Sequence, residues 1–183
     1  MAMGLPVILQ IVGYQNSGKT TVITKLLQCL SKKGIHAGVL KHHGHSGHLN
    51  FNDAGKDTER HRTAGAFMTG VSSSGGSVLS MNTELTLDQG IRIYDSLNMD
   101  CILIEGYKNI QHPRIVLCRD YSLDQELLNQ SHHMVACISL NPLEGQGGNI
   151  PFFLWKDEEK WLDFLVHYIE SKSSKERLGH ETF

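Results

Sequence analysis

The sequence predicts an α/β fold in three layers, a mostly parallel β-sheet flanked by helices on both faces. Short, continuous apolar runs such as 101–104 are typical of parallel strands that are buried on both sides. Segments with apolar residues at helical spacing follow several of these runs. A glycine-bounded loop at 13–20 joins the first run directly to the first helical segment. Strands that alternate with helices form a parallel sheet, and ligands bind at the carboxyl ends of its strands.

The first half of the chain is expected to contain four strands and two helices. Gly34 ends the first helix, because glycine adopts the left-handed conformation that is common just after a helix. Asp57 is placed to cap the second helix through its carboxylate. A Ser/Gly turn at 72–76 favours a hairpin between the strands on either side. The expected ranges are strands at 5–12, 35–41, 66–71 and 77–81, and helices at 21–30 and 57–64.

The second half of the chain is expected to contain four more strands and two helices. Thr86 is placed to cap the first of these helices. The last helix carries an apolar face from Trp161 to Ile169, and the polar residues from Ser171 onward are expected to fray. The expected ranges are a helix at 86–97, strands at 101–105, 114–118, 134–139 and 152–155, and a helix at 161–169.

Length and composition are typical of one soluble domain. A chain of 183 residues has the size of a single domain, so we expect one domain over 1–170 and a polar tail over 171–183. The net charge of −2 gives no electrostatic reason to expect nucleic acid or a membrane surface as a partner. No apolar stretch has the length of a membrane span. The four scattered cysteines are expected to be free thiols, which indicates a cytoplasmic protein.

Residues 13–20, Gly-Tyr-Gln-Asn-Ser-Gly-Lys-Thr, form a complete phosphate-binding loop between a strand and a helix. The two glycines let backbone N–H groups converge on one anion, where the helix N-terminus adds its partial positive charge. Lys19 is placed to neutralise the β- and γ-phosphates of a nucleoside triphosphate, and the Thr20 hydroxyl to complete a Mg²⁺ shell. The residues expected to bind nucleotide here are Gly13, Tyr14, Gln15, Asn16, Ser17, Gly18, Lys19, Thr20 and Thr21.

Glu105 and Gly106 close an apolar strand where phosphoryl-transfer proteins place their second acidic element. We expect Glu105 to act on Mg²⁺ through a water molecule or to contact the nucleophilic water. Lys19 and Glu105 are therefore the candidate catalytic residues, and Thr20 and Glu105 the candidate metal ligands. The alternative is a carboxylate that is simply solvated at a strand end. Gly106 is expected to bring its N–H close to a γ-phosphate.

Three further segments have less specific signals. Asp57 or Thr58 could act as a nucleotide-dependent switch, although Asp57 could also serve only as a helix cap. A histidine group could hold Zn²⁺ or Ni²⁺, although contact with phosphate, a partner or a cofactor precursor is favoured. Asp120 could pair with guanine and Asn141 could contact its rim, since the usual guanine-reading Asn-Lys-x-Asp is absent from the sequence. The histidines are His42, His43, His45 and His48.

Beyond the phosphate-binding loop, three segments occur in a specific order: Val39-Leu40-Lys41-His42, Gly55-Lys56-Asp57-Thr58 and Glu105-Gly106-Tyr107-Lys108. Together with 62–66 and 115–120 they resemble the molybdopterin-guanine dinucleotide biosynthesis adaptor proteins, the MobB family, over roughly 5–140. The resemblance implies a three-layer P-loop NTPase fold, a homodimer, and GTP binding with Mg²⁺ and slow hydrolysis. It also implies a role in molybdenum cofactor biosynthesis, beside molybdopterin guanylyltransferase and other enzymes of that cofactor.

The same resemblance assigns residues to the site. It implies that the loop at 13–20 and Glu105 form the nucleotide and metal site, with Lys41, His42 and Asp57 as neighbours. The second loop residue is Tyr14, where some dimeric relatives carry a lysine, so a phosphate contact from a partner subunit is not supported.

Two other functions remain open. A small-molecule kinase would use the same loop, but it needs a lid of clustered arginines, and the arginines of this chain are dispersed. A metal-delivery GTPase would use the histidine group. A GTP-binding adaptor with weak hydrolysis is favoured, because neither an arginine finger nor a water-orienting glutamine can be identified.

Overall fold

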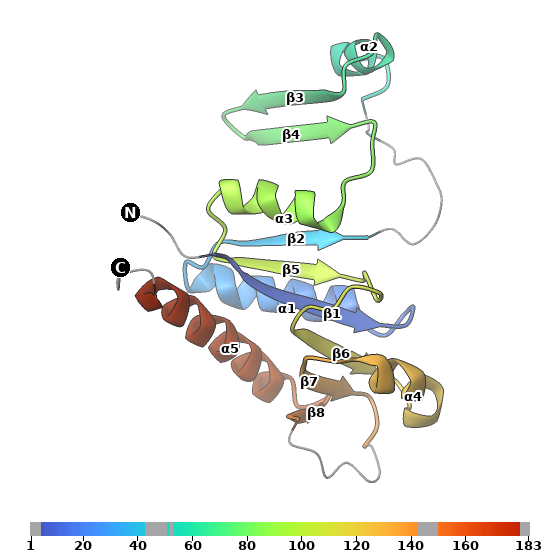
Figure 1. The fold of residues 1–183 in the computed structure, drawn as a ribbon, viewed down its shortest axis with the longest axis vertical. Helices are drawn as coiled ribbons and strands as arrows, with labels where there is room; N and C mark the ends of the chain where they lie inside the picture. Colours follow the sequence, from blue (N-terminus) through green and yellow to red (C-terminus); the bar gives the residue numbers. More distant parts are fainter. Residues whose placement is uncertain (1–4, 43–50, 52, 143–149, 180–183) are drawn as a thin grey trace. The chain divides into compact units, whose positions relative to one another are not determined.

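The computed structural model describes residues 5–42, 51, 53–142 and 150–179, and the chain forms two compact units. The first unit combines residues 1–43 with 90–183, and the second consists of residues 44–89. The sequence predicts one domain over 1–170, whereas the structure separates a second unit within that range. Figure 1 shows both units.

The first unit is built on a six-stranded sheet in which every neighbouring pair of strands is parallel (Figure 1). The order of its strands is β2-β5-β1-β6-β7-β8. Because all six strands run in one direction, their carboxyl ends lie along the same edge of the sheet. The strands are β1 (Val7–Gly13), β2 (Ala37–Lys41), β5 (Cys101–Glu105), β6 (Arg114–Cys118), β7 (Met134–Ser139) and β8 (Phe152–Leu154).

Helices α1 (Lys19–Lys32) and α5 (Glu158–Gly179) pack together on one face of this sheet. Leu26 of α1 and Trp161 of α5 are fully buried there, in one core with strand residues such as Ile11. Removing each such side chain from water stabilises the fold by about 1.5–3 kcal/mol. This face therefore supplies most of the hydrophobic core.

The opposite face is covered by two more helices, α3 (Leu87–Ser96) and α4 (Tyr121–Gln130). Successive residues of a strand point to opposite faces, so Val12 points away from the Ile11 core and packs near Leu127 of α4. The Tyr94 ring of α3 fills the space where a side chain at Gly38 of β2 would lie. Layers of helices on both faces confirm the predicted α/β architecture.

Two helices at the C-terminal half differ from the sequence prediction. α4 was not predicted, because a polar residue, Asp124, occupies a fully buried position of the helix and weakens the apolar periodicity. α5 continues to Gly179, so the prediction that the chain frays from Ser171 is wrong. The predicted strand positions at 101–105, 114–118 and 134–139 are confirmed.

The second unit contains one short helix and a two-stranded antiparallel sheet, which confirms the predicted hairpin. Its elements are α2 (Asp57–Thr63), β3 (Met68–Ser73) and β4 (Gly76–Met81). Asp57 is the first residue of α2 and the cap position is Lys56, without a capping side-chain hydrogen bond, so the predicted Asp57 cap is wrong.

Arg62 holds the second unit together. Its buried guanidinium pairs with Asp53, with one of the two hydrogen bonds measuring 2.7 Å, and donates to the Ser80 hydroxyl of β4 at 3.2 Å. It also lies over the Phe51 ring, 4.3 Å from its centroid. One side chain therefore joins the segment before α2, the helix itself and the hairpin.

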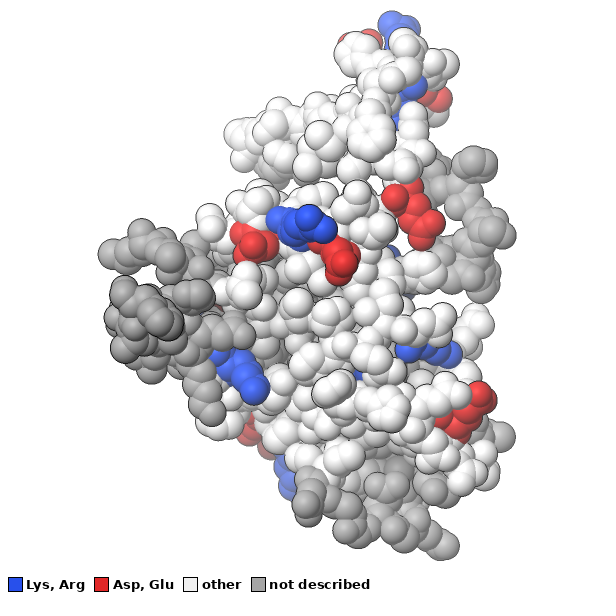
Figure 2. All heavy atoms as spheres, in the orientation of Figure 1, with Lys and Arg blue, Asp and Glu red and all other residues white. Residues whose placement is uncertain are grey.

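Three further features of the described structure are its helix lengths, its surface charges and its cysteines. Within the described ranges, no helix combines the length and the apolar character needed to cross a membrane. On the face drawn in Figure 2, the described Lys and Arg side chains are scattered among Asp and Glu. All four cysteines are free, as predicted.

Candidate functional site

The loop at 13–20 leaves the carboxyl end of β1 and enters α1 directly. Gly18 occupies the cap position with a φ of 88°, a conformation that L side chains rarely adopt. A side chain at Gly18 would collide with the Trp155 ring, and one at Gly13 would collide with the Ser17 hydroxyl. Both glycines are therefore required by close packing as well as by the turn.

The first turn of α1 leaves its positive end without an internal partner. No side chain caps this helix, and no acidic residue lies in its described first turn. The Ser17 side chain is buried, and its hydroxyl has no hydrogen-bond partner among the described residues. Unpaired donors at a helix N-terminus attract anions, so the loop fits a phosphate group.

Lys19 folds back over the loop that precedes it. Its ammonium group donates to the carbonyl oxygens of Gly13 at 3.0 Å and Tyr14 at 2.7 Å. These hydrogen bonds hold the charge at the mouth of the loop, where a bound phosphate would compete for it.

The surroundings of Lys19 are rich in positive charge. Burial lowers the pKa of Lys19, Glu105 raises it, and the positive charges of Lys108, Lys41 and Arg119 lower it further. Three cations therefore act on the Lys19 ammonium group beside the Glu105 carboxylate. A polyanion bound at Lys19 would offset this repulsion.

Glu105 ends β5 directly beside the loop, and the structure brings it together with two other predicted site residues. Its carboxylate is almost fully buried and pairs with Lys41 of β2 at 3.0 Å. It also accepts a long hydrogen bond of 3.5 Å from the Thr20 hydroxyl. Parallel pairing of β2 and β5 places Lys41 opposite Glu105 in the register.

Thr20 and Glu105, the predicted metal ligands, lie side by side next to the loop. A hydroxyl and a carboxylate are hard oxygen ligands, which fit Mg²⁺ when water and phosphate oxygens complete its shell. Among the described residues, no group of three or more His, Cys, Asp or Glu side chains could hold a metal by itself. The donor set thus fits an ion that arrives with a nucleotide.

Gly106 differs from the sequence expectation. It adopts a positive φ of 89°, but its N–H donates to the Ile11 carbonyl oxygen at 3.2 Å. Its carbonyl oxygen accepts from the Gln10 side-chain amide at 2.7 Å. The expected approach of the Gly106 N–H to a γ-phosphate is therefore not what this structure shows, because the sheet already uses that donor.

Asp120, which follows β6, has a structural role in this fold. It caps α4, accepting from the Ser122 backbone N–H at 2.9 Å. Asn141, the second candidate for reading a base, donates to the Arg119 carbonyl oxygen at 3.4 Å. Base recognition by either residue stays a prediction.

The other predicted site residues lie elsewhere or outside the description. Asp57 belongs to the second unit, where it is exposed and pairs with Arg60 at 3.5 Å, and Thr58 donates to Asp53 at 2.8 Å. His42 lies at the end of β2 with its ring 4.8 Å from the Tyr107 ring. The rest of the histidine group, His43, His45 and His48, lies outside the described residues.

Several residues around the loop were not predicted from the sequence. Gln10 is fully buried in the middle of β1, and a polar residue inside an apolar strand was a signal that could have found it. Buried Asp124 fixes Arg119 by accepting from its guanidinium at 2.8 Å and from its backbone N–H at 2.7 Å. The contact between Trp155 and Gly18 joins residues too far apart in sequence for any local pattern to reveal.

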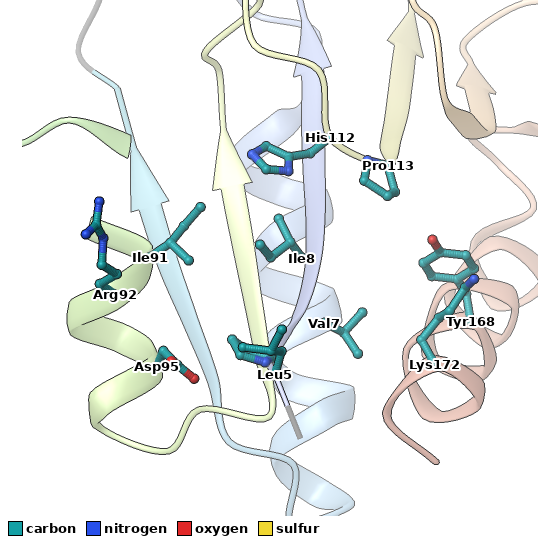
Figure 3. Close-up of a pocket in the computed structure, with 11 residues that line it drawn as sticks. Leu5, Val7, Ile8, Ile91, Arg92, Asp95, His112, Pro113, Tyr168 and Lys172 are labelled. Atoms are coloured by element: carbon teal, nitrogen blue, oxygen red, sulfur yellow. The ribbon is translucent and has the colours of Figure 1, made fainter. Parts of the chain in front are cut away.

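A separate pocket of about 460 Å³ lies at the amino end of β1 (Figure 3). Ile91, Arg92 and Asp95 reach it from α3, and Tyr168 and Lys172 reach it from α5. Its other lining residues are Leu5, Pro6, Val7, Ile8, His112 and Pro113. The strand separates this pocket from the loop, which begins at the opposite end of β1.

The chain is similar to proteins of one family. Residues 8–140 match the family model described as Molybdopterin guanine dinucleotide synthesis protein B, MobB. A probable molybdopterin-guanine dinucleotide biosynthesis adapter protein of Bacillus subtilis is 38% identical, with 91% of this chain and 95% of that protein covered. The Escherichia coli adapter protein is 31% identical, with the same shares covered.

Solved structures agree with this family. The crystal structure of Bacillus subtilis MobB has a TM-score of 0.74 and 35% identity, and covers 88% of this chain and 96% of its own. A MobB homologue from Bacillus stearothermophilus has a TM-score of 0.72 and 29% identity, with 90% and 98% covered. The family model, the relatives and the fold lead to one conclusion: this chain belongs to the MobB family of molybdopterin guanine dinucleotide synthesis proteins.

Proposed function

We propose that this protein is a GTP-binding adaptor with weak GTPase activity that assists molybdopterin guanine dinucleotide biosynthesis. The observation that carries the proposal is the loop at 13–20, with its uncapped helix N-terminus and the buried Ser17 hydroxyl. The relatives named as adapter proteins of this biosynthesis support the pathway. The guanine dinucleotide in those names favours GTP over ATP.

Binding follows from the charges around the loop. Backbone N–H groups of the loop and of the first turn of α1 would donate to phosphate oxygens. Lys19 would exchange the carbonyl oxygens of Gly13 and Tyr14 for phosphate oxygens, which form stronger charge-assisted hydrogen bonds. Mg²⁺, held by Thr20 and Glu105, would add positive charge at the phosphates.

Hydrolysis would be slow because few groups serve the chemical step. In this reaction a water oxygen bonds to the γ-phosphorus, the bond to the bridging oxygen breaks with its electron pair staying on GDP, and the proton of the water passes to the released phosphate. Glu105 is the candidate to orient that water, but its carboxylate is paired with Lys41. Turnover therefore requires that this pair opens or shifts.

The cellular setting is part of the same proposal. An adaptor acts on other proteins, so we propose molybdopterin guanylyltransferase and other molybdenum cofactor enzymes as partners, in the cytoplasm. A homodimer is proposed from the family resemblance alone. Asp57 is proposed as a nucleotide-dependent switch, and Asp120 as a residue near the base.

Calorimetry tests the nucleotide site. Wild-type protein with Mg²⁺ is expected to bind GTP, and Lys19→Ala to weaken that binding by about 100-fold or more, because a charge facing the phosphates is lost. Glu105→Gln is expected to lower the hydrolysis rate more than the affinity. Lys160→Ala removes an exposed lysine of α5 that pairs with Asp157, and should change neither. Near-normal GTP affinity in Lys19→Ala would contradict the site assignment.

A further inference from the structure

The connection between β5 and β6 carries one charged side chain, Lys108, toward the phosphate-binding loop. It consists of eight residues, 106–113, and crosses β1, which lies between these two strands in the sheet. Buried Gln10 of β1 holds this crossover against the strand. Its side-chain amide donates to the carbonyl oxygens of Gly106 at 2.7 Å and Tyr107 at 2.8 Å. The same side chain accepts from the His112 N–H at 3.4 Å.

A second buried side chain holds the far part of the crossover. Arg114 is 1% exposed, and its guanidinium donates to the carbonyl oxygens of Ile110 at 2.5 Å and His112 at 3.5 Å. Burial disfavours the charged form of Arg114 and lowers its pKa, and the two carbonyl oxygens offset part of that cost. Hydrogen bonds from Gln10 and Arg114 therefore hold both parts of the crossover, and with them the backbone that carries Lys108.

Lys108 reaches from this crossover to the phosphate-binding loop. Its ammonium group lies over the Tyr14 ring, 4.0 Å from the ring centroid. The Tyr14 carbonyl oxygen accepts from Lys19 at 2.7 Å, so two ammonium groups meet at one loop residue. In the part of the chain that the structure describes, no carboxylate pairs with Lys108.

Arg119 also contacts the Tyr14 ring, but it is held in a different way from Lys108. Its guanidinium also lies over the Tyr14 ring, at 5.3 Å from the centroid, but buried Asp124 pairs with it. Arg119 is thus fixed by a carboxylate, whereas a cation–π contact holds Lys108. A cation–π contact at an exposed position is a weak attraction, whereas a charge-assisted hydrogen bond from an ammonium group to a phosphate oxygen is a strong one.

We propose that Lys108 is a second phosphate-binding cation, which leaves the Tyr14 ring to contact the terminal phosphate of a bound nucleoside triphosphate. This inference rests on the proposed nucleotide site and names the residue that would tell a triphosphate from a diphosphate. Without a nucleotide, the Lys108 ammonium group lies on the Tyr14 ring. Because hydrogen bonds hold the backbone of the crossover, the ammonium group would move from the ring to the phosphate by rotation of the Lys108 side chain.

The test compares two nucleotides on the full-length protein. Calorimetry with Mg²⁺ measures the affinities for a non-hydrolysable GTP analogue and for GDP in wild type, Lys108→Ala and Lys108→Arg. Lys108→Ala is expected to lose about tenfold in affinity for the triphosphate and less than twofold for GDP, because one phosphate contact is missing. Lys108→Arg should keep most of the preference for the triphosphate.

A control variant separates this role from a structural one. Lys160→Ala, the control on α5, should match wild type for both nucleotides. Circular dichroism on heating checks that Lys108→Ala, a change at an exposed position, folds as wild type does.

Each outcome bears on a different claim. If wild type binds both nucleotides and Lys108→Ala loses the same factor for each, or none, the role of Lys108 is overturned and the nucleotide site stands. If wild type binds neither nucleotide, the proposed function fails and this inference fails with it.

Discussion

Gly18 is the residue at which the loop, the first helix and the core meet. Its positive φ of 88° favours glycine, and the Trp155 ring occupies the space next to its α-carbon. Trp155 in turn lies beside Trp161, with ring centroids 6.1 Å apart, and its carbonyl oxygen accepts from the Trp161 indole at 3.3 Å. The shape of the loop therefore depends on the C-terminal part of the chain.

The structure gives this contact a matched control. Gly18→Ala is expected to lower the free energy of unfolding by about 1–3 kcal/mol more than Gly34→Ala does, because both positions have positive φ but only Gly18 faces an aromatic ring. Chemical denaturation of the two variants measures the difference. Equal losses would mean that the Trp155 contact contributes nothing beyond backbone strain.

Sequence patterns were informative where a motif or a strand end fixes the position of a residue on the backbone. Lys19, Thr20 and Glu105 could be predicted as site residues because they lie in a loop motif and at a strand end. Gln10 and Lys108 could not, since their partners are about 100 residues away in the sequence, Gly106 for the first and Tyr14 for the second. Only the parallel sheet brings these residues together.

At the scale of elements, the second unit depends on one ion pair more than on apolar packing. Its hairpin exposes large apolar side chains, such as Val71 and Val78, and gives the unit little core of its own. The pair between Arg62 and Asp53 links α2 to the segment before it. The hydrogen bond from Arg62 lowers the pKa of Asp53 from 3.8 to about 2.

Acid should therefore loosen this unit. A carboxyl group whose pKa is lowered by folding stabilises the folded state above its unfolded pKa of 3.8, and that contribution is lost as the pH falls toward about 2. Backbone amide NMR signals of β3 and β4 should lose dispersion between pH 4 and pH 2. Asp53→Asn should show the loss already at pH 7, whereas Asp57→Asn, at an exposed position, should resemble wild type.

At the scale of the whole molecule, the central sheet of the first unit is buried on both faces. All five residues of β5 and of β6 are buried, which is why these strands could be found from their apolar runs. Three of the four cysteines lie on these strands and on β7, and all three are buried. Burial raises the pKa of Cys101 and of Cys137 to about 12.

Thiol reactivity reports on this core. At pH 8 one thiol per chain, Cys29 of α1, is expected to react rapidly with Ellman's reagent, because the buried thiols are neither accessible nor ionised. All four should react in denaturant, and Cys29→Ser should leave no fast thiol in the native protein. Rapid reaction of two or more thiols in native protein would show that the sheet opens readily.

The sequence by itself determined the strands, most of the helices, the loop at 13–20 and the family, because these depend on residues that lie close together along the chain. It did not determine the second compact unit, the helix α4 or the use of the Gly106 N–H by the sheet. Only the tertiary structure decided which cations surround Lys19 and that Lys108 rests on Tyr14. Such contacts join residues distant in sequence, and their geometry exists only once the parallel strands have assembled.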